Sequence, residues 1–290
     1  MSDSKINNHI PVLLNEVVEY LKPKAGERYL DLTAGYGGHA SAIIARTAAP
    51  DQATLVDRDM NAVQALNQKL PKSKIVQANA AEYLTDSLDV AYDIILADIG
   101  VSSPHIDVAS RGFSFMTEGP LDMRMDQSQQ LTAETVVNAF SEVELADILY
   151  TYGDEKFSRR IAHEIIKNRP LYKTTELAGI IRGCLGTRKS AHPEARSFQA
   201  LRVFVNDEIR QLEVILAQAP FRLNPGGRLG IISFHSLEDR LIKQKFSELG
   251  QNTYDSQYRL LTKKPISPSN IEIVSNPRAR SAKLRVLQRK

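Results

Sequence analysis

The chain has 290 residues, of which 42% are hydrophobic and 24% are charged, and its formal net charge is only +3. This is ordinary globular composition, which excludes collagen-like, disordered and coiled-coil proteins, and the length allows one large domain or two modest ones. No apolar run approaches the roughly 18–20 residues that span a bilayer. We therefore expect a cytoplasmic protein with no membrane partner. Because Cys184 is the single cysteine, we also expect no internal disulfide and no cysteine-based zinc site.

Short apolar segments alternate with helix-like segments through the first hundred residues. Helical spacing of Val, Leu and Ile predicts a first helix over Pro11–Leu21. The expected strands are Tyr29–Leu32, Ala53–Val56, Lys74–Gln77 and Asp93–Ala97, and the helices between them are His39–Thr47 and Asn61–Lys69. This alternation predicts right-handed βαβ units and a parallel sheet covered on both faces.

A different pattern follows the fourth strand. From about Asp107 to Ala200 there is helical periodicity without a convincing strand, with helices expected at Ala133–Ala139, Glu142–Tyr150, Arg159–Lys167 and Thr175–Cys184. A long helix over Phe198–Ala219 then leads to a fifth strand, Arg228–Phe234. We therefore predict an α/β protein: a doubly wound, Rossmann-like sheet formed by residues 1–106 and 201–290, interrupted by an all-helical domain at residues 107–200.

The expected first strand ends in an acid and a glycine-rich turn, Asp31-Leu32-Thr33-Ala34-Gly35-Tyr36-Gly37-Gly38-His39. Glycines let a ligand approach the backbone, and the start of the following helix offers free N–H donors. The carboxylate of Asp31, four residues before Gly35, would repel a pyrophosphate but suits a cation such as the sulfonium of S-adenosylmethionine. A purely structural tight turn is the alternative.

Acids also follow the second strand, in Asp57-Arg58-Asp59. Folds of this kind use an acid at this place to bind a ribose diol, and Asp57 is the better candidate. Its alternative role is to cap the helix at Asn61, which Asp59 could do equally well. After the third strand, the side chain of Asn79 or the backbone of Ala81 is a candidate to read the edge of an adenine.

The fourth strand ends at Asp98. In open α/β sheets the ligand crevice lies outside the carboxyl ends of the strands, so this carboxylate is expected to face both cofactor and substrate. An acceptor for the N–H bonds of an exocyclic amine favours the nucleophilic form of the amine, and alignment with the methyl group supplies the rest of the catalysis. The alternative is that Asp98 only begins a turn.

Basic residues concentrate in two segments. Residues 155–202 hold 11 basic and 4 acidic side chains, and residues 241–290 hold 11 and 3, whereas the rest of the chain is acidic. This distribution favours a nucleic acid as partner, with a solvated helix face and a loose basic tail as the alternative. Arg111 and Arg124 flank Phe113, and arginines beside an aromatic ring can bind phosphate and stack on unpaired bases. A second cluster contains His235 and Arg240. The alternatives are that Phe113 packs in a core and that His235 forms a hydrogen bond at a strand end.

Taken together, these motifs resemble the bacterial ribosomal small-subunit methyltransferase H family, formerly called MraW. The resemblance covers nearly the whole chain and rests on His9–Leu14, Gly37–His39, Asp57–Asp59, Asp98–Pro104, Arg111–Phe115, Pro120–Asp126, Tyr152–Glu155, Phe198–Arg202, Pro225–Arg240 and Asn276–Ser281. It implies a class I S-adenosylmethionine-dependent methyltransferase that acts on N4 of a cytosine in the decoding region of 16S rRNA. The 30S subunit is the expected form of the substrate, and free rRNA is the alternative. A methyltransferase for another nucleic acid or a small molecule, and a non-catalytic RNA-binding protein, are the alternatives.

The resemblance also implies a set of site residues. The S-adenosylmethionine contacts are Gly37, Gly38, His39, Asp57, Ala81, Asp98 and His105, of which Asp98 is also catalytic. The family commonly has Phe in place of Ala81 and Gln in place of His105, and Tyr83 is a candidate to replace the stacking contact of that Phe. The expected RNA contacts are Arg111, Phe113, Arg124, Arg196, Arg202, His235, Arg278 and Arg280. No metal centre is expected, and the oligomeric state, monomer or homodimer, is left open.

Overall fold

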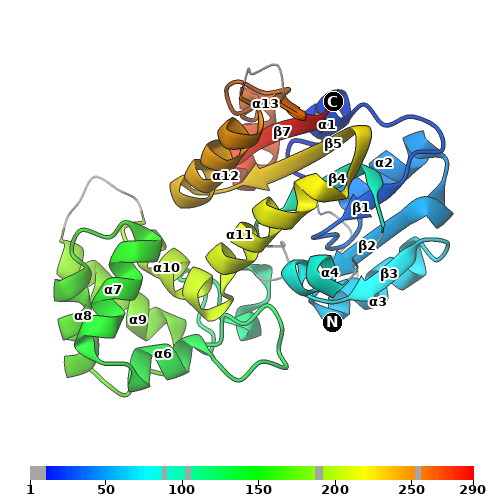
Figure 1. Cartoon of the computed structure of the whole chain (residues 1–290). Helices are drawn as coiled ribbons and strands as arrows, with labels where there is room; N and C mark the ends of the chain where they lie inside the picture. The colour runs from blue at the N-terminus through cyan, green and yellow to red at the C-terminus, as the bar shows by residue number, and fades with distance from the viewer. Residues whose placement is uncertain (1–10, 87–89, 102–105, 187–191, 252–255) are drawn as a thin grey trace. The chain divides into compact units, whose positions relative to one another are not determined.

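The computed structural model describes residues 11–86, 90–101, 106–186, 192–251 and 256–290 of the chain (Figure 1). The chain forms two compact units. Unit 1 combines Met1–Gly100 with Arg210–Lys290, and unit 2 is the intervening stretch Val101–Ile209. Among the described helices, none has the length and apolar character needed to cross a membrane.

Unit 1 is built around a seven-stranded sheet of order β3-β2-β1-β4-β5-β7-β6. Its strands are β1 Tyr29–Asp31, β2 Ala53–Asp57, β3 Lys74–Gln77, β4 Tyr92–Asp98, β5 Leu223–Ser233, β6 Tyr258–Leu260 and β7 Lys283–Arg289. Strands β1 to β5 are parallel, so their carboxyl ends meet at one edge, whereas β7 is antiparallel to both β5 and β6. The strand order reverses between β1 and β4, and such a switch point opens a ligand crevice at the carboxyl edge.

Helices cover both faces of this sheet. They are α1 Leu14–Leu21, α2 Gly38–Thr47, α3 Met60–Lys69, α4 Ala80–Asp86, α11 Glu208–Gln218 and α12 Ser236–Leu249. The short helix α13 Asn270–Ser275 has no buried side chain. Alternate residues of β4 reach two separate cores: Ile94 and Leu96 pack with α1, α2 and α3, while Ile95 and Ala97 pack with α4, α11 and α12. A parallel sheet that is buried on both faces requires such continuously apolar strands.

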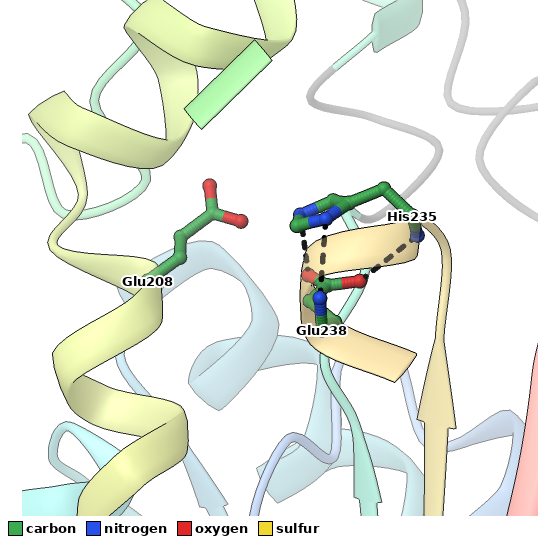
Figure 2. Close-up of side chains that lie close together, drawn as sticks. All are labelled: Glu208, His235 and Glu238. Carbon is green, nitrogen blue, oxygen red and sulfur yellow. Dashed lines mark hydrogen bonds and ion pairs between the residues drawn. The ribbon is translucent and has the colours of Figure 1, made fainter. Parts of the chain in front are cut away.

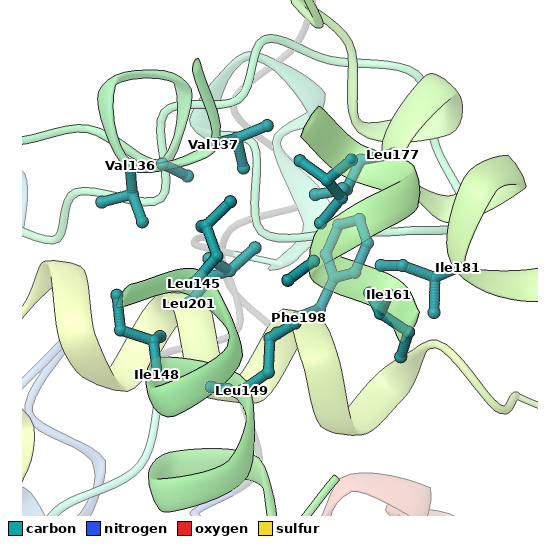
Figure 3. Close-up of a cluster of buried hydrophobic side chains, with 14 of the residues drawn as sticks. Val136, Val137, Leu145, Ile148, Leu149, Ile161, Leu177, Ile181, Phe198 and Leu201 are labelled. Carbon is teal, nitrogen blue, oxygen red and sulfur yellow. The ribbon is translucent and has the colours of Figure 1, made fainter. Parts of the chain in front are cut away.

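The described helices of unit 2 are α6 Ala133–Ala139, α7 Glu142–Gly153, α8 Ser158–Lys167, α9 Thr174–Leu185 and α10 Ala195–Val205. Cap residues set the start of two of them: Thr132 accepts a hydrogen bond at the start of α6, and Ser141 forms a capping box with Glu144 on α7. The apolar faces of the helices meet in one core, in which Leu149 and Phe198 are fully or almost fully buried (Figure 3). Unit 2 therefore has a hydrophobic core of its own.

The predicted doubly wound sheet, with helices between its fourth and fifth strands, is confirmed. One predicted helix is wrong, because Phe198–Ala219 is divided into α10 and α11 at Asn206 and Asp207. The Asn206 side chain accepts a hydrogen bond from the Met125 amide at 2.8 Å and donates one to the Met123 carbonyl at 2.7 Å. Asp207 has a positive φ of 49°. Side-chain bonds to a neighbouring loop thus override the helical periodicity.

The C-terminal residues differ more from the prediction. The sequence pattern predicts no element beyond the fifth strand and leaves a loose basic tail open, whereas the structure contains α12, β6, α13 and β7 there. Arg285 of β7 is only 6% exposed. Its Nε donates to Asp239 Oδ1 at 2.7 Å, and Lys283 Nζ lies 3.2 Å from Asp239 Oδ2. Part of the basic charge near the C-terminus therefore belongs to the fold.

We predict that Arg285→Gln lowers the free energy of unfolding by about 2–4 kcal/mol, because Asp239 would keep a largely buried charge with only Lys283 to balance it. Chemical denaturation followed by circular dichroism measures the change. Arg280→Gln, at an exposed position of the 3-10 turn Pro277–Ser281, is the control and is expected to cost less than about 0.5 kcal/mol. Equal effects of the two substitutions would contradict the prediction.

Candidate active site

Three carboxylates gather at the carboxyl edge of the sheet in unit 1. Asp31 ends β1, Asp57 ends β2 and Asp98 ends β4, and these strands are neighbours in the order β2-β1-β4. Because parallel strands end at the same edge, the topology brings together acids that are far apart in the sequence. An edge with this charge attracts cations and hydroxyl groups and repels phosphates.

The loop between β1 and α2 takes its shape from its glycines. Gly35 and Gly37 have positive φ values of 52° and 72°, which other residues adopt only at a cost. A Cβ on Gly38, the first residue of α2, would lie 2.4 Å from Pro11 Cγ. A Cβ on Gly35, by contrast, would meet nothing nearer than the Thr33 carbonyl oxygen at 4.0 Å, among the described residues. The loop is therefore packed from one side and, in the described part of the chain, leaves room at Gly35.

Asp57 fixes this loop to the end of β2. Its Oδ2 accepts a hydrogen bond from the Gly35 amide and its Oδ1 accepts one from the Asp59 amide, both at 2.8 Å. Asp59 in turn caps α3 by accepting a hydrogen bond from the Asn61 amide at 3.0 Å. The structure thus separates the two roles that the sequence leaves open: Asp59 is the helix cap, and Asp57 faces the glycine loop.

Asp31 lies deeper than the other two acids, with 1% of its surface exposed. The Tyr29 hydroxyl donates to Oδ2 at 2.6 Å and the Thr33 amide donates to Oδ1 at 3.2 Å. Burial raises the pKa of Asp31 to about 6, although the Tyr29 hydrogen bond and the nearby His39 act in the opposite direction. Asp31 therefore supports the turn after β1 from inside the protein, and its charge changes in a mildly acidic range.

Asp98 lies beside a buried histidine. His39 Nε2 donates a hydrogen bond to the Val12 carbonyl at 2.9 Å, which leaves Nδ1 as the acceptor nitrogen, 3.8 Å from Asp98 Oδ2. Burial lowers the pKa of His39, against the effects of Asp31 and the Val12 carbonyl, so the ring is neutral at pH 7. The backbone N–H of Asp98 donates to Thr33 Oγ1 at 2.6 Å, which joins the end of β4 to the glycine loop.

The position expected to meet an adenine lies at the start of α4. Asn79 Oδ1 accepts a hydrogen bond from the Ala81 amide at 3.0 Å, so the side chain of Asn79 stabilises the first turn of the helix. Tyr83 is buried, and its hydroxyl lies 2.7 Å from that of Tyr92. Its suggested role in stacking is therefore wrong, because the ring is part of the core of unit 1. His105 lies outside the described residues.

Two arginines of unit 2 bind parts of their own unit. Arg111 is 8% exposed and donates to the carbonyls of Arg124 and Met125. Arg124 forms two hydrogen bonds with the Asp122 carboxylate, at 2.9 and 2.8 Å, and two more with loop carbonyls. Phe113 is half-buried against the helical core. Structural roles account for these residues, and RNA contact by any of them remains a prediction.

The other basic candidates differ in their surroundings. Arg202 forms two hydrogen bonds with the Glu208 carboxylate, at 2.9 and 2.8 Å, and both side chains are largely buried. Arg196 is exposed and donates to a backbone carbonyl just after α7. Arg278 and Arg280 are exposed on the 3-10 turn before β7. Arg202 therefore has a structural partner within unit 2, and RNA contact by any of these four arginines remains a prediction.

His235 is the cap residue of α12 (Figure 2). Its Nδ1 accepts a hydrogen bond from the Glu238 amide at 3.4 Å, and its Nε2 lies 3.0 Å from Glu238 Oε1. Glu238 Oε2 accepts from the amides of Phe234 and His235, at 2.8 and 3.1 Å, which completes a capping box. Glu208, also drawn in Figure 2, is the partner of Arg202. We therefore assign no metal to these residues, and RNA contact by His235 remains a prediction.

Thr33 and Gly100 received no role from the sequence. Thr33 accepts the backbone hydrogen bond from Asp98. A Cβ on Gly100 would lie 2.4 Å from Phe234 Cε2, so the absence of a side chain lets the chain after β4 lie against this ring at the end of β5. A glycine two residues after an acid at a strand end is a signal of such a close approach.

Comparison with known proteins places the chain among methylases. It matches the model of the MraW methylase family over residues 6–290. Curated relatives named Ribosomal RNA small subunit methyltransferase H include that of Cyanothece sp., 50% identical over 97% of this chain and 94% of its own length, and that of Koribacter versatilis, 43% identical over 98% and 94%. A solved structure of an rRNA methylase from Streptococcus thermophilus is similar with a TM-score of 0.41 and 11% identity, over 95% of this chain and 94% of that one. Structural similarity as low as this has no bearing on function.

We predict that Asp31→Asn gains stability relative to the unsubstituted protein as the pH rises. The folded carboxyl has a pKa of about 6 and the unfolded one a pKa of about 3.9, so between these values only the folded state holds the proton and its stability falls with rising pH. The whole effect is about 3 kcal/mol. Asparagine keeps an acceptor for Tyr29 and does not titrate. Urea unfolding of both proteins between about pH 4 and pH 7 measures the difference, and a difference that does not change with pH would show that Asp31 is ionised throughout.

Proposed function

Because this chain belongs to the MraW methylase family, we propose that it transfers a methyl group from S-adenosylmethionine to the exocyclic N4 amine of a cytosine in the decoding region of 16S rRNA. The shared name of its relatives supports small-subunit rRNA as the substrate. The fold is that of class I methyltransferases, with the antiparallel β7 between β5 and β6. We further propose that the helical unit takes part in RNA recognition.

The carboxyl edge of unit 1 suits S-adenosylmethionine better than a dinucleotide. A pyrophosphate would meet the carboxylates of Asp57 and Asp98, with the buried Asp31 behind them, whereas a sulfonium and an ammonium group are cations. When bound, the cofactor supplies a methyl group on a positively charged sulfur. Asp57 accepts hydrogen bonds from the backbone amides of Gly35 and Asp59, and we assign it the ribose hydroxyls because a carboxylate accepts several hydrogen bonds at once. Room at Gly35 allows a ligand to approach the backbone.

We propose that Asp98 binds the exocyclic amine of the substrate cytosine. The lone pair of an exocyclic amine is delocalised into the base, and a carboxylate that accepts its N–H bonds returns electron density to the nitrogen. The Asp98 side chain is 20% exposed, and its backbone is held by Thr33. Transfer of the methyl group would break its bond to sulfur, which would leave as a neutral thioether. The methylated nitrogen would then have to lose one proton, which we assign to the Asp98 carboxylate. The neutral ring of His39 lies beside this carboxylate, with Nδ1 3.8 Å from Asp98 Oδ2.

The placement of Cys184 argues against methylation at carbon 5 of cytosine. That reaction needs a thiolate to add to the ring before the carbon becomes nucleophilic. Cys184 is 4% exposed in the core of unit 2, and burial raises the pKa of its thiol. A protonated and buried thiol is a poor nucleophile. Attack by N4 needs no covalent intermediate with the protein.

The observation that carries this proposal is the set of acids that end β1, β2 and β4 around a glycine loop, in a chain that matches the family over nearly its whole length. The test is methyl transfer from labelled S-adenosylmethionine to 30S particles isolated from cells that lack the protein. Digested 16S rRNA is expected to contain labelled N4-methylcytidine. Naked 16S rRNA and DNA are parallel substrates. Labelled 5-methylcytidine, or label on DNA alone, would contradict the proposal.

We predict that Asp57→Ala weakens S-adenosylmethionine binding by roughly 1.5–3 kcal/mol, the usual effect of losing hydrogen bonds to a charged group. Isothermal titration calorimetry measures the affinity, and a thermal melt shows whether the variant, which also loses the acceptor for Gly35, is folded. Asp51→Ala, at an exposed turn before β2, is the control and is expected to bind normally. If the Asp57 variant binds S-adenosylmethionine with unchanged affinity, another residue must contact the ribose, and Asp59 is the first candidate.

We predict that Asp98→Ala lowers kcat at least about 100-fold, in line with the removal of a positioned polar group from a transition state. Cys184→Ser is expected to retain methyl transfer, because the thiol takes no part in attack by N4. Both variants are assayed on 30S particles at saturating cofactor. An inactive Cys184 variant together with an active Asp98 variant would refute both the mechanism and the site of methylation.

A further inference from the structure

Helix α8 has two opposite faces. Ile161 and Ile165 are buried in the core of unit 2. Arg159, Arg160 and Lys167 are exposed. At 3.6 residues per turn these three basic positions fall on the side opposite the apolar stripe, and they extend along about 12 Å of helix.

Lys156, just before the helix, is also exposed, and we call Lys156, Arg159, Arg160 and Lys167 the α8 basic face. In the part of unit 2 that the structure describes, none of these four side chains has a hydrogen bond or an ion pair. This separates them from the arginines of unit 2 that bind carbonyls or carboxylates of their own unit. The α8 basic face has no structural role comparable to that of the buried arginines.

The acids near α8 do not neutralise this face. Glu142 of α7 lies 3.2 Å from His163 Nδ1 and is paired there. Glu155, before the start of α8, is 2% exposed and accepts a hydrogen bond from the Phe157 amide at 2.9 Å. Glu164 is half-buried on α8 itself, Asp154, two residues before Lys156, is exposed, and the exposed acid Asp147 belongs to α7. With Glu164 and Asp154 counted against its four cations, the face keeps an excess of positive charge.

Two further residues extend the surface near the start of α8. Phe157, between Lys156 and the first arginine, is 36% exposed. Arg196 is exposed and donates to the Asp154 carbonyl at 3.3 Å, two residues before Lys156 in the chain. Exposed cations next to an exposed aromatic ring are typical of surfaces that bind a phosphate backbone and stack on an unpaired base.

We propose that the α8 basic face binds the phosphate backbone of the RNA substrate, with Phe157 as a surface on which a base stacks. This inference rests on the proposed function and names the part of unit 2 that contacts RNA. Contacts of this kind neutralise phosphates and release counterions, so they add affinity without reading sequence. They act on the KM for the particle, whereas the chemical step belongs to the carboxyl edge of unit 1.

The test compares two triple variants with the unsubstituted protein. Arg159→Gln/Arg160→Gln/Lys167→Gln removes charge from the α8 basic face. The matched control, Arg46→Gln/Lys72→Gln/Lys74→Gln, removes the same charge from exposed positions in unit 1, at the end of α2 and the start of β3. A third variant, Arg159→Lys/Arg160→Lys, keeps the positive charge and replaces each guanidinium by an ammonium group. Circular dichroism establishes that all are folded.

Affinity for naked 16S rRNA is measured across a salt series, and methyl transfer is measured on 30S particles. The α8 triple variant is expected to bind RNA about 10- to 100-fold more weakly at 0.1 M salt, with the slope of log K against log salt reduced by about 2–3. Its KM for 30S particles is expected to rise in proportion, with kcat changed less than about twofold and cofactor affinity unchanged. The unit 1 control and the lysine variant are expected to resemble the unsubstituted protein.

An unchanged salt slope in the α8 variant would overturn the inference. So would a loss of affinity for 30S particles with unchanged affinity for naked rRNA, because that result would assign the face to an acidic protein of the particle. Failure of the unsubstituted protein to methylate 30S particles would refute the proposed function instead. The salt series measures RNA affinity without methyl transfer, so failure of the inference and failure of the proposed function are distinguishable.

Discussion

The carboxylate of Asp57 is the contact on which the carboxyl edge of unit 1 depends. It holds the amides of Gly35 and Asp59, and Asp59 in turn caps α3. One side chain thereby connects the loop after β1, the end of β2 and the start of the next helix. Hydrogen bonds to an ionised acceptor are the stronger kind. A ligand that adds its own hydrogen bonds to this carboxylate meets a group that is already in position, which reduces the entropy lost on binding.

The parallel strands and their terminal acids could be predicted from the sequence, because a buried strand is a short apolar run and an acid at its end breaks that run. The division of the long helix could not, since it depends on bonds between Asn206 and a loop about eighty residues earlier in the chain. β7 was missed because Lys283, Arg285 and Arg289 interrupt its apolar residues. Tyr83 was misjudged because its partner, Tyr92, belongs to another element.

The count of basic residues says little about where a polyanion binds, because many arginines of this chain are used internally. Arg111 binds backbone carbonyls, Arg202 binds Glu208 and Arg285 binds Asp239. Each long side chain fills space as well as carrying charge, and its guanidinium can bond several acceptors at once. Arg159 and Arg160 carry the same guanidinium group, but they lie on the outer side of an amphipathic helix. The distinction between the two groups comes from their partners in the fold, which a linear charge pattern does not contain.

The sheet of unit 1 is interrupted in the chain by the whole of unit 2, yet β4 and β5 are neighbours, with Ile94 opposite Arg228. Pairs so distant in sequence form slowly, because a long flexible loop must close before their contacts are gained. The core of unit 2, by contrast, joins residues that all lie within the inserted stretch itself. These contacts do not require β4 and β5 to have met. We therefore expect that folding of unit 2 shortens the flexible chain between these strands, which lowers the entropy cost of closing the sheet that the unit divides.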